Sequence, residues 1–456
     1  MKFINLTRRV EIGANSYYLQ AGGRNIVLDS GMHPKFEGDE ALPNLKALGD
    51  VRLDAIIVSH SHQDHIGTLP VLMRRQPHAR VFMTEPTGEI GSTLLHNSVN
   101  VMTRQREEIG TTLYPLFTHR ETDRAAERWQ LCALRQPYTL AGERSSADDA
   151  EVTFEFFEAG HVLGSTGILI RAEGRTLFYT GDVNFDDQTI AQAAVFPEEK
   201  IDILIMECTR GDTPAPATWS RKGEEARLAQ AIEDAFTRGG CVLIPVFALG
   251  KTQEVLAMLY NFRREENLDF PIYIGGLSAK ITQIYDRRAQ MGRRQFPRLQ
   301  LLDELRPFVL NADTIQEART RPGRVYALSS GMMTPKTLSN IFAQRVVDQP
   351  RQSIFFVGYA DPESPAGILR NARQDEQVKL DPDEPSQRVR CHIEQFQFSA
   401  HASRESLIAY AGRLAPKKII LVHGDPPAVE WVRARLTNDL PNSEIVVPTP
   451  GVEMEL

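Results

Sequence analysis

Short apolar runs recur along the chain and predict β-strands joined by turns and helices. Residues 16–20 and 25–29 flank a glycine-containing turn and predict a hairpin, and residues 53–58 form a β-branched run with the length of a buried strand. A short helix is expected over 68–76 and a returning strand over 79–84. The order strand, helix, strand predicts an α/β layered fold.

The pattern changes after this first unit. Residues 87–135 are mostly helical in composition, and the small and acidic residues 142–150 predict a loop. Apolar strands are then expected within the stretches 152–158, 176–184 and 201–209. The last two of these strands each deliver a carboxylate at their end.

Alternating strand and helix units occupy residues 208–395, beginning with a strand at 241–248 and a helix at 252–260. This pattern indicates an inserted α/β domain. After it, the stretches 396–401 and 418–423 are each expected to be a strand that ends in a histidine.

Four metal-capable side chains lie within six residues, directly after the strand expected over 53–58. They are His60, His62, Asp64 and His65. In an extended chain His60 and His62 project to the same side, and a turn after them could aim Asp64 and His65 at a second ion. Neutral imidazoles with a carboxylate are the ligand set that zinc takes in hydrolytic sites. The cluster therefore predicts a zinc site rather than a group of polar surface residues.

Other expected strand ends carry further polar groups. His161 lies between glycines, which permit a close approach of the backbone to an ion, and Asp182 follows an apolar strand. Asp29 ends the second strand of the hairpin, where its carboxylate either supports the metal histidines or caps the turn. Because a polar group recurs at the end of several expected strands, we expect these strand ends to form one site together.

These residues resemble the metallo-β-lactamase fold superfamily, in which an aspartate, an H-x-H-x-D-H cluster, a later histidine and a later aspartate build a dinuclear zinc site. The matching positions, in chain order, are Asp29, His60, His62, Asp64, His65, His161 and Asp182. The resemblance implies an αββα sandwich. It does not choose a substrate, because the fold hosts lactamases, thioesterases, glyoxalases, phosphodiesterases and nucleases.

The second half of the chain is similar to the β-CASP branch of that superfamily, whose members process nucleic acids and include ribonucleases and a cleavage-and-polyadenylation endonuclease. Glu207 falls at the first extra motif of the branch, His401 in Ser-Ala-His at the second, and His423 in Leu-Val-His-Gly-Asp at the third. Inserted-domain signatures are matched by residues 245–254, 329–333 and 357–359. The resemblance implies a metallo-β-lactamase domain of residues 1–207 and 396–456, with residues 208–395 forming an inserted α/β β-CASP domain.

The resemblance also implies a role for each site residue. One zinc ion is expected on His60, His62 and His161. The other is expected on Asp64, His65 and His423, with Asp182 as the bridging ligand, and both aspartates count as catalytic. His401 is expected to protonate the leaving 3′ oxygen while Glu207 orients it, although His401 could instead cap a helix. Substrate contacts are expected from Ser399, Ser330 and Gly331.

The function implied is a ribonuclease with two zinc ions per chain and an active site between the domains, leaving 5′-phosphate and 3′-hydroxyl ends. Endonuclease and 5′-exonuclease action are both left open. The alternatives are a non-catalytic RNA-binding or assembly subunit and a nuclease directed at DNA. A small-ester or thioester hydrolase is a less favoured alternative, because a large inserted domain would form the second wall of a cleft for a polymer.

Composition adds limits to this picture. The net charge of -7 leaves no global basic footprint, so single-stranded RNA would have to be held by the cleft itself, by a second copy of the chain or by a partner subunit. The four cysteines are far apart and indicate neither a disulfide framework nor a zinc knuckle, which suits the cytoplasm. With 42% hydrophobic residues but no long apolar run, the chain is expected to be neither secreted nor membrane-spanning.

Overall fold

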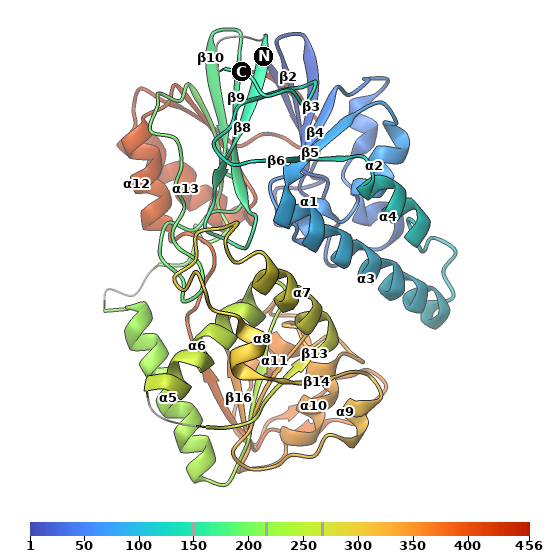
Figure 1. Ribbon diagram of the computed structural model, residues 1–456, viewed down its shortest axis with the longest axis vertical. Helices are drawn as coiled ribbons and strands as arrows, with labels where there is room; N and C mark the ends of the chain where they lie inside the picture. Colours follow the sequence, from blue (N-terminus) through green and yellow to red (C-terminus); the bar gives the residue numbers. More distant parts are fainter. Residues whose placement is uncertain (147–150, 215–217, 266–268) are drawn as a thin grey trace.

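The computed structural model describes residues 1–146, 151–214, 218–265 and 269–456. Two lobes lie one above the other in Figure 1. The upper lobe contains both chain ends and the two sheets of a sandwich, and the lower lobe is built from the middle of the chain. This arrangement confirms the expected αββα sandwich with an inserted α/β unit.

The first sheet of the upper lobe has seven strands in the order β22-β1-β2-β3-β4-β5-β6. Its strands are β1 (Lys2–Asn5), β2 (Tyr17–Ala21), β3 (Arg24–Leu28), β4 (Ala55–Ile57), β5 (Arg80–Thr84), β6 (Trp129–Cys132) and β22 (Glu453–Glu455). The pairs β3–β4, β4–β5 and β5–β6 are parallel. The predicted hairpin and the predicted strands near residues 53–58 and 79–84 are confirmed.

The second sheet of the upper lobe also has seven strands, in the order β21-β20-β11-β10-β9-β8-β7. Its strands are β7 (Tyr138–Thr139), β8 (Val152–Glu158), β9 (Thr166–Ala172), β10 (Arg175–Tyr179), β11 (Ile203–Glu207), β20 (Lys418–Val422) and β21 (Glu444–Val446). Side chains from both sheets share one buried core, where the rings of Phe82 and Phe154 lie 4.7 Å apart. Burial of these apolar faces holds the sandwich together.

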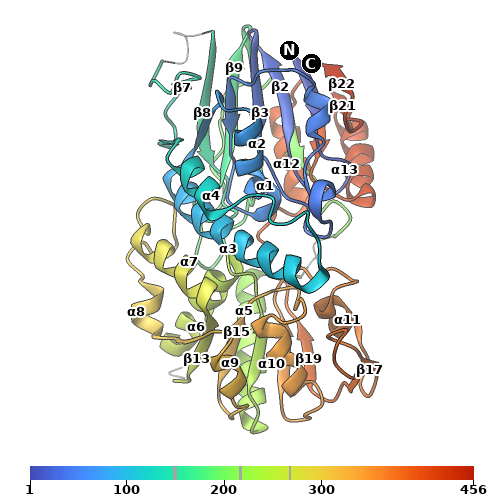
Figure 2. The same cartoon turned by 90° about the vertical axis from the view of Figure 1, so that its right-hand side faces the viewer.

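Helices cover the two outer faces of this sandwich (Figures 1 and 2). On the first sheet lie α1 (Gln63–Ile66), α2 (Leu69–Arg75), α3 (Glu85–Ile109) and α4 (His119–Ala126), with the short 3₁₀ turns η1 (Gly38–Ala41) and η2 (Leu45–Leu48) nearby. On the second lie α12 (Arg404–Leu414) and α13 (Pro426–Asp439). The predicted helix at 68–76 is therefore confirmed as α2.

The lower lobe contains a six-stranded, all-parallel sheet in the order β14-β13-β15-β12-β16-β19. Its strands are β12 (Val242–Pro245), β13 (Ile272–Gly275), β14 (Phe308–Leu310), β15 (Val325–Leu328), β16 (Ser353–Phe356) and β19 (His392–Gln395). Its helices are α5 (Arg221–Thr237), α6 (Lys251–Glu265), α7 (Gly276–Arg287), α8 (Leu301–Leu305), α9 (Thr314–Glu317), α10 (Leu338–Val346) and α11 (Pro365–Asn371), and β17 (Gln377–Val378) pairs with β18 (Gln387–Arg388). The expected alternation of strand and helix is confirmed.

The two lobes meet along α3, which runs over the boundary in both views (Figures 1 and 2). Near the start of this helix, Glu85 lies 2.8 Å from Arg288 of the lower lobe, and near its end Glu108 lies 3.3 Å from Lys336. A third ion pair joins Lys35 to Asp361 at 2.6 Å. These pairs hold the lower lobe against the edge of the sandwich where the functional residues gather.

One local prediction needs correction. Residues 396–401 do not form a strand, because β19 ends at Gln395 and the chain then crosses from the lower to the upper lobe. The alternating Phe396 and Phe398 instead lie beneath the guanidinium groups of Arg227 and Arg221. The region predicted to be mostly helical, residues 87–135, also contains β6, and residues 147–150 of the predicted loop lie outside the described residues. Within the described ranges, no helix is both long and apolar enough to cross a membrane.

Candidate metal centre and active site

The candidate site lies where the carboxyl ends of strands from both sheets meet. In the first sheet β3 and β4 are parallel neighbours, and in the second β10, β11 and β20 are parallel neighbours. Each strand is followed by polar residues at the same edge of the sandwich. This shared edge explains how residues far apart in the sequence come together.

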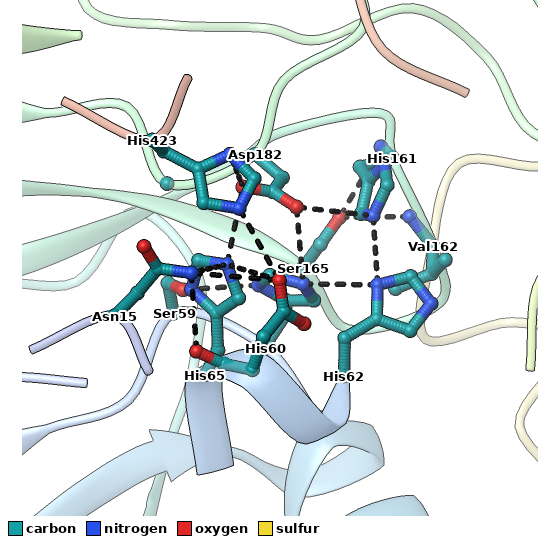
Figure 3. A network of polar contacts seen from close by, with 12 residues as sticks. Asn15, Ser59, His60, His62, His65, His161, Val162, Ser165, Asp182 and His423 are labelled. Atoms are coloured by element: carbon teal, nitrogen blue, oxygen red, sulfur yellow. Dashed lines mark hydrogen bonds and ion pairs between the residues drawn. The ribbon is translucent and has the colours of Figure 1, made fainter. Parts of the chain in front are cut away.

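Four side chains form the first group, which Figure 3 shows from close by. His60 Nε2 lies 3.1 Å from His62 Nδ1, which in turn lies 3.0 Å from His161 Nε2. The Oδ2 atom of Asp182 lies 3.5 Å from His60 Nε2 and 3.6 Å from His161 Nε2. The four ligand atoms therefore surround one point.

The second group consists of Asp64, His65 and His423. Asp64 Oδ2 lies 3.3 Å from His423 Nε2 and 3.7 Å from His65 Nε2. The other oxygen of Asp182, Oδ1, lies 3.3 Å from His65 Nε2 and 3.4 Å from His423 Nδ1. The Asp182 carboxylate thus faces both groups, one oxygen toward each (Figure 3).

The geometry of the first group fits a metal cation. Tetrahedral ligands about 2.0–2.1 Å from zinc lie about 3.3–3.4 Å from one another, close to the distances in this group. His161 donates its Nδ1 hydrogen to Ala400 O at 2.8 Å, which leaves the lone pair of Nε2 directed at the neighbouring ring. Three imidazole nitrogens and a carboxylate oxygen that converge in this way are a suitable ligand set for a metal cation.

The pKa shifts of His60, His161 and Asp182 support the same fit. Burial lowers the pKa of His60 and of His161 well below the ordinary value, so both rings are neutral and able to bind a metal. Burial alone would raise the pKa of Asp182, but His423 and His65 outweigh it and hold that pKa well below its usual range. A buried, ionised carboxylate between two histidine groups is suited to bridge two cations, and its Oδ1 atom has no hydrogen-bond partner among the described residues.

Asp29 sits behind the second group. Its carboxylate accepts hydrogen bonds from Ser59 N at 2.7 Å and from Tyr179 Oη at 2.7 Å. Its Oδ2 atom also lies 2.8 Å from His65 Nδ1, which fixes Nε2 as the nitrogen that faces the site. Burial lowers the pKa of His65, but nearby carboxylates, led by Asp182, outweigh it and raise the pKa well above the ordinary value. The contacts of the Asp29 carboxylate therefore fit support of the histidine segment, and not a cap of the turn after β3, where Ser30 N and Gly31 N donate to His65 O and Asn15 O.

His401 belongs to a third group, in which it lies with Glu207 beside the shared Asp182. Its Nδ1 atom lies 3.1 and 3.2 Å from the two carboxylate oxygens of Glu207, and its Nε2 atom lies 4.0 Å from Asp182 Oδ2. Glu207 ends β11, is fully buried, and also accepts a hydrogen bond from Val183 N at 2.7 Å. The N-cap of α12 is Ser403, so His401 does not cap that helix.

The three residues expected to bind substrate occupy different places. Ser399 accepts a hydrogen bond from His401 N at 3.0 Å and donates one to His401 O at 3.1 Å, so it shapes the turn that carries His401. Ser330 and Gly331 follow β15 in the lower lobe, where Ser330 Oγ accepts a hydrogen bond from Thr334 N. Among the described residues, no hydrogen bond or ion pair joins Ser330 or Gly331 to the histidine cluster.

Two side chains at the site were not predicted from the sequence. Asn15 Nδ2 donates to the backbone oxygen of Asp64 at 3.2 Å and lies 3.4 Å from His65 Nε2. Thr209 Oγ1 lies 2.8 Å from His423 Nδ1. Thr209 follows the matched Glu207 by two residues, which was a usable signal, whereas Asn15 precedes an ordinary strand and carried none.

Comparison with known proteins identifies the fold and its parts. The chain matches the model of the metallo-beta-lactamase superfamily at residues 9–234, that of the Beta-Casp domain at 252–369, and that of the Zn-dependent metallo-hydrolase RNA specificity domain at 386–448. The chain therefore belongs to the metallo-β-lactamase superfamily. Within it, the second and third domains assign the chain to the β-CASP branch.

Several named proteins and one solved structure are similar to the chain. The chain is 27% identical to "Endoribonuclease YSH1" of Saccharomyces cerevisiae over 455 residues, which cover 96% of this chain and 56% of that protein. It is 26% identical to "Cleavage and polyadenylation specificity factor subunit 3-I" of Arabidopsis thaliana, covering 96% of this chain and 61% of the relative. The chain thus spans just over half the length of these relatives. A crystal structure of a protein of unknown function from Enterococcus faecalis V583 shares the fold, with a TM-score of 0.57, 13% identity and coverage of 100% and 99% of the two chains.

Proposed function

We propose that this protein is a metal-dependent ribonuclease that hydrolyses RNA phosphodiester bonds to 5′-phosphate and 3′-hydroxyl products. The observation that carries the proposal is a histidine paired with a buried glutamate beside two groups of metal-type ligands. A purely structural metal site has no need of such a histidine, whereas hydrolysis of a phosphodiester has, because the leaving oxygen must be protonated. The names of the YSH1 relatives, which are called endoribonucleases, support the same activity and its endonuclease form.

Two zinc ions per chain are the proposed cofactors. His60, His62 and His161 would hold one ion, Asp64, His65 and His423 the other, and Asp182 would bridge them. When bound, the ions would activate the attacking water and neutralise charge that develops on the phosphate. All seven ligand side chains come from the upper lobe, so the site does not depend on closure of the lower lobe for its assembly.

His401 is the proposed general acid. Glu207 accepts from Nδ1, so Nε2 is the atom that faces the site and can transfer a proton to the leaving 3′ oxygen. Burial lowers the pKa of His401, but the carboxylates of Glu207, Asp182 and Asp64 outweigh it and raise the pKa above its ordinary value. The raised pKa favours the protonated form of the ring, which is the form that an acid catalyst requires.

The proposed substrate is single-stranded RNA bound between the lobes. The division into a metallo-β-lactamase domain of residues 1–207 and 396–456 and a β-CASP domain of residues 208–395 forms part of this proposal. The match at residues 386–448 to a domain described by its RNA specificity supports RNA over DNA. Ser330 and Gly331 lie on the lower lobe and would contact the strand from that side.

The test uses uniformly labelled single-stranded RNA with a 5′-hydroxyl, a 5′-monophosphate or a blocked 5′ end. An endonuclease is expected to yield internal fragments from all three, each beginning with a 5′-phosphate. Mononucleotides released first, and only from accessible 5′ ends, would indicate a 5′ exonuclease instead. Binding of RNA without cleavage by zinc-loaded protein would contradict the proposal and favour a non-catalytic RNA-binding subunit, and cleavage of DNA alone would make it a DNA nuclease.

A further inference from the structure

The carboxyl edge of the lower sheet faces the metal site. At this edge β15, β12 and β16 are neighbouring parallel strands, and each is followed by a loop directed toward the upper lobe. Lys251, which begins α6 after the β12 loop, donates a hydrogen bond to Phe398 O in the crossing segment. Ligands of open parallel sheets bind outside this edge, so its side chains are candidates for substrate contact.

Two large aromatic side chains are exposed at this edge. Phe247 follows β12 and is 38% exposed, and Tyr359 follows β16 and is 61% exposed. Gly331, which follows β15, packs against the Phe247 ring so closely that a Cβ atom there would lie 3.0 Å from two ring atoms. One side of the Phe247 ring is therefore backed by protein, while part of the ring remains open to solvent.

The loops that carry the two aromatic residues contact different parts of the upper lobe. Phe247 belongs to the loop that ends at Gly250, where an added Cβ atom would lie 2.7 Å from the side chain of Val162, the neighbour of His161. Tyr359 lies on the other side, two residues before Asp361, which pairs with Lys35 of the upper lobe. Partial burial raises the pKa of the Tyr359 phenol, and the carboxylates of Asp361 and Asp425 raise it further.

Asp425 relates the position of Tyr359 to the second group of metal ligands. It follows His423 by two residues and serves as the N-cap of α13, so its carboxylate marks the part of the upper lobe that holds the second ligand group. The Tyr359 phenol is close enough to this carboxylate to be affected by its charge. The two exposed rings thus lie on loops that approach different parts of the upper lobe, one loop reaching Val162 beside His161 and the other lying near Asp425, two residues after His423.

We propose that Phe247 and Tyr359 stack on unpaired bases of the RNA strand, one on each side of the scissile phosphate. The inference rests on the proposed ribonuclease function and names the substrate contacts of that site. Exposed aromatic rings are the usual platforms for bases of single-stranded nucleic acid, and they tolerate any sequence because every base has a π-face. Bases in a duplex are already stacked on one another, so the two rings select an unpaired strand and add little sequence preference.

Suitable variants separate stacking from packing. Phe247→Leu and Tyr359→Leu keep an apolar side chain but remove the ring face, whereas Tyr359→Phe keeps the face and removes the hydroxyl group. Phe308 provides a matched control, because it is 56% exposed on the edge strand β14, where its ring already stacks on Tyr273 at 5.0 Å. Phe308→Leu removes an exposed ring from the same lobe without touching the edge that faces the metal site.

The experiment measures binding of the full chain, loaded with zinc, to a short single-stranded RNA with a non-hydrolysable central linkage. A second set of RNAs carries an abasic nucleotide at one position at a time on either side of that linkage. Each leucine variant is expected to weaken binding about 5- to 100-fold. That loss should vanish at one abasic position, different for the two variants, while Tyr359→Phe and Phe308→Leu bind like the wild type. On cleavable RNA, both leucine variants should raise KM more than they lower kcat.

The outcomes distinguish this inference from the proposed function. If the wild type binds and cleaves RNA but both leucine variants bind as tightly as it does, the stacking proposal is wrong and the ribonuclease proposal stands. If a variant loses the same affinity for intact and abasic RNA, the ring supports the fold rather than a base, which also contradicts stacking. Failure of the wild type to bind single-stranded RNA at all would overturn both.

Discussion

The Nδ1 atom of His401 lies 3.1 Å from the Oε1 atom of Glu207, although the two residues are separated by 194 positions in the chain. Glu207 reaches this position because β11 ends there, and the fully buried carboxylate is held in place by Val183 N. The pair fixes the ring so that its other nitrogen faces Asp182 and the space between the lobes. The proposed role of His401 as an acid catalyst differs from that of a metal ligand, and the two roles predict different experimental results.

The pH dependence of cleavage should report on this pair. Glu207 raises the pKa of His401, so the protonated, active form persists to higher pH and the rate falls as the pH rises through that raised pKa. Glu207→Gln removes the negative charge, and the fall in kcat/KM is expected to shift to lower pH. Profiles of both proteins with saturating zinc test this point, and an unchanged position of the high-pH fall would show that Glu207 does not control the acid.

Metal content should depend on the bridging carboxylate. Protein purified without chelator is expected to contain close to two zinc ions per chain, and Asp182→Ala should lower that content because its two oxygens face both ligand groups. Elemental analysis provides the measurement, and thermal unfolding with and without zinc provides a second readout that does not depend on activity. Full cleavage in the presence of a strong chelator would contradict metal dependence.

Asp29 should affect metal affinity without being a ligand. Asp29→Asn keeps the size of the side chain but weakens the contact to His65 Nδ1, and loss of such a supporting carboxylate typically costs about 10- to 100-fold in metal affinity. Competition with a zinc chelator measures the effect. Thr176→Ala, at a distant hydroxyl group that bonds to Lys200 O and Asp202, is a suitable control and should leave zinc affinity unchanged. Equal affinity of Asp29→Asn and wild type would mean that Asp29 only stabilises the fold, through Ser59 and Tyr179.

Much of this site could be predicted because its chemistry is local in the sequence. His60, His62, Asp64 and His65 lie within one turn after a buried strand, and parallel strands bring their carboxyl ends to one edge. The fold followed from the alternation of strands and helices, together with the matched motifs. Contacts between residues far apart in the sequence, such as Thr209 Oγ1 with His423 Nδ1, could not be predicted in this way. They depend on which strands become neighbours in the sheet, here β11 and β20.

The errors arose where tertiary contacts overrode a local pattern. Phe396 and Phe398 alternate with polar residues, as a half-buried strand does, yet their rings pack against arginine side chains of α5 while the chain changes lobes. The exposure of Phe247 and Tyr359 could not be predicted from the sequence either, because an aromatic residue at the end of an apolar run is usually part of the core. Only the three-dimensional structure shows that these two rings are exposed, on loops that follow neighbouring strands of the lower sheet.

The most direct measurement compares His401→Ala and Asp182→Ala on RNA that carries sulfur in place of the bridging 3′ oxygen at the scissile linkage. This leaving group needs no protonation, so removal of the acid should no longer matter. On ordinary RNA, His401→Ala is expected to retain its zinc and lose about 10²- to 10⁴-fold in cleavage rate. On the sulfur substrate it should recover close to the wild-type rate, while Asp182→Ala should remain inactive on both. Equal loss of His401→Ala on the two substrates would contradict the assignment of His401 as the general acid.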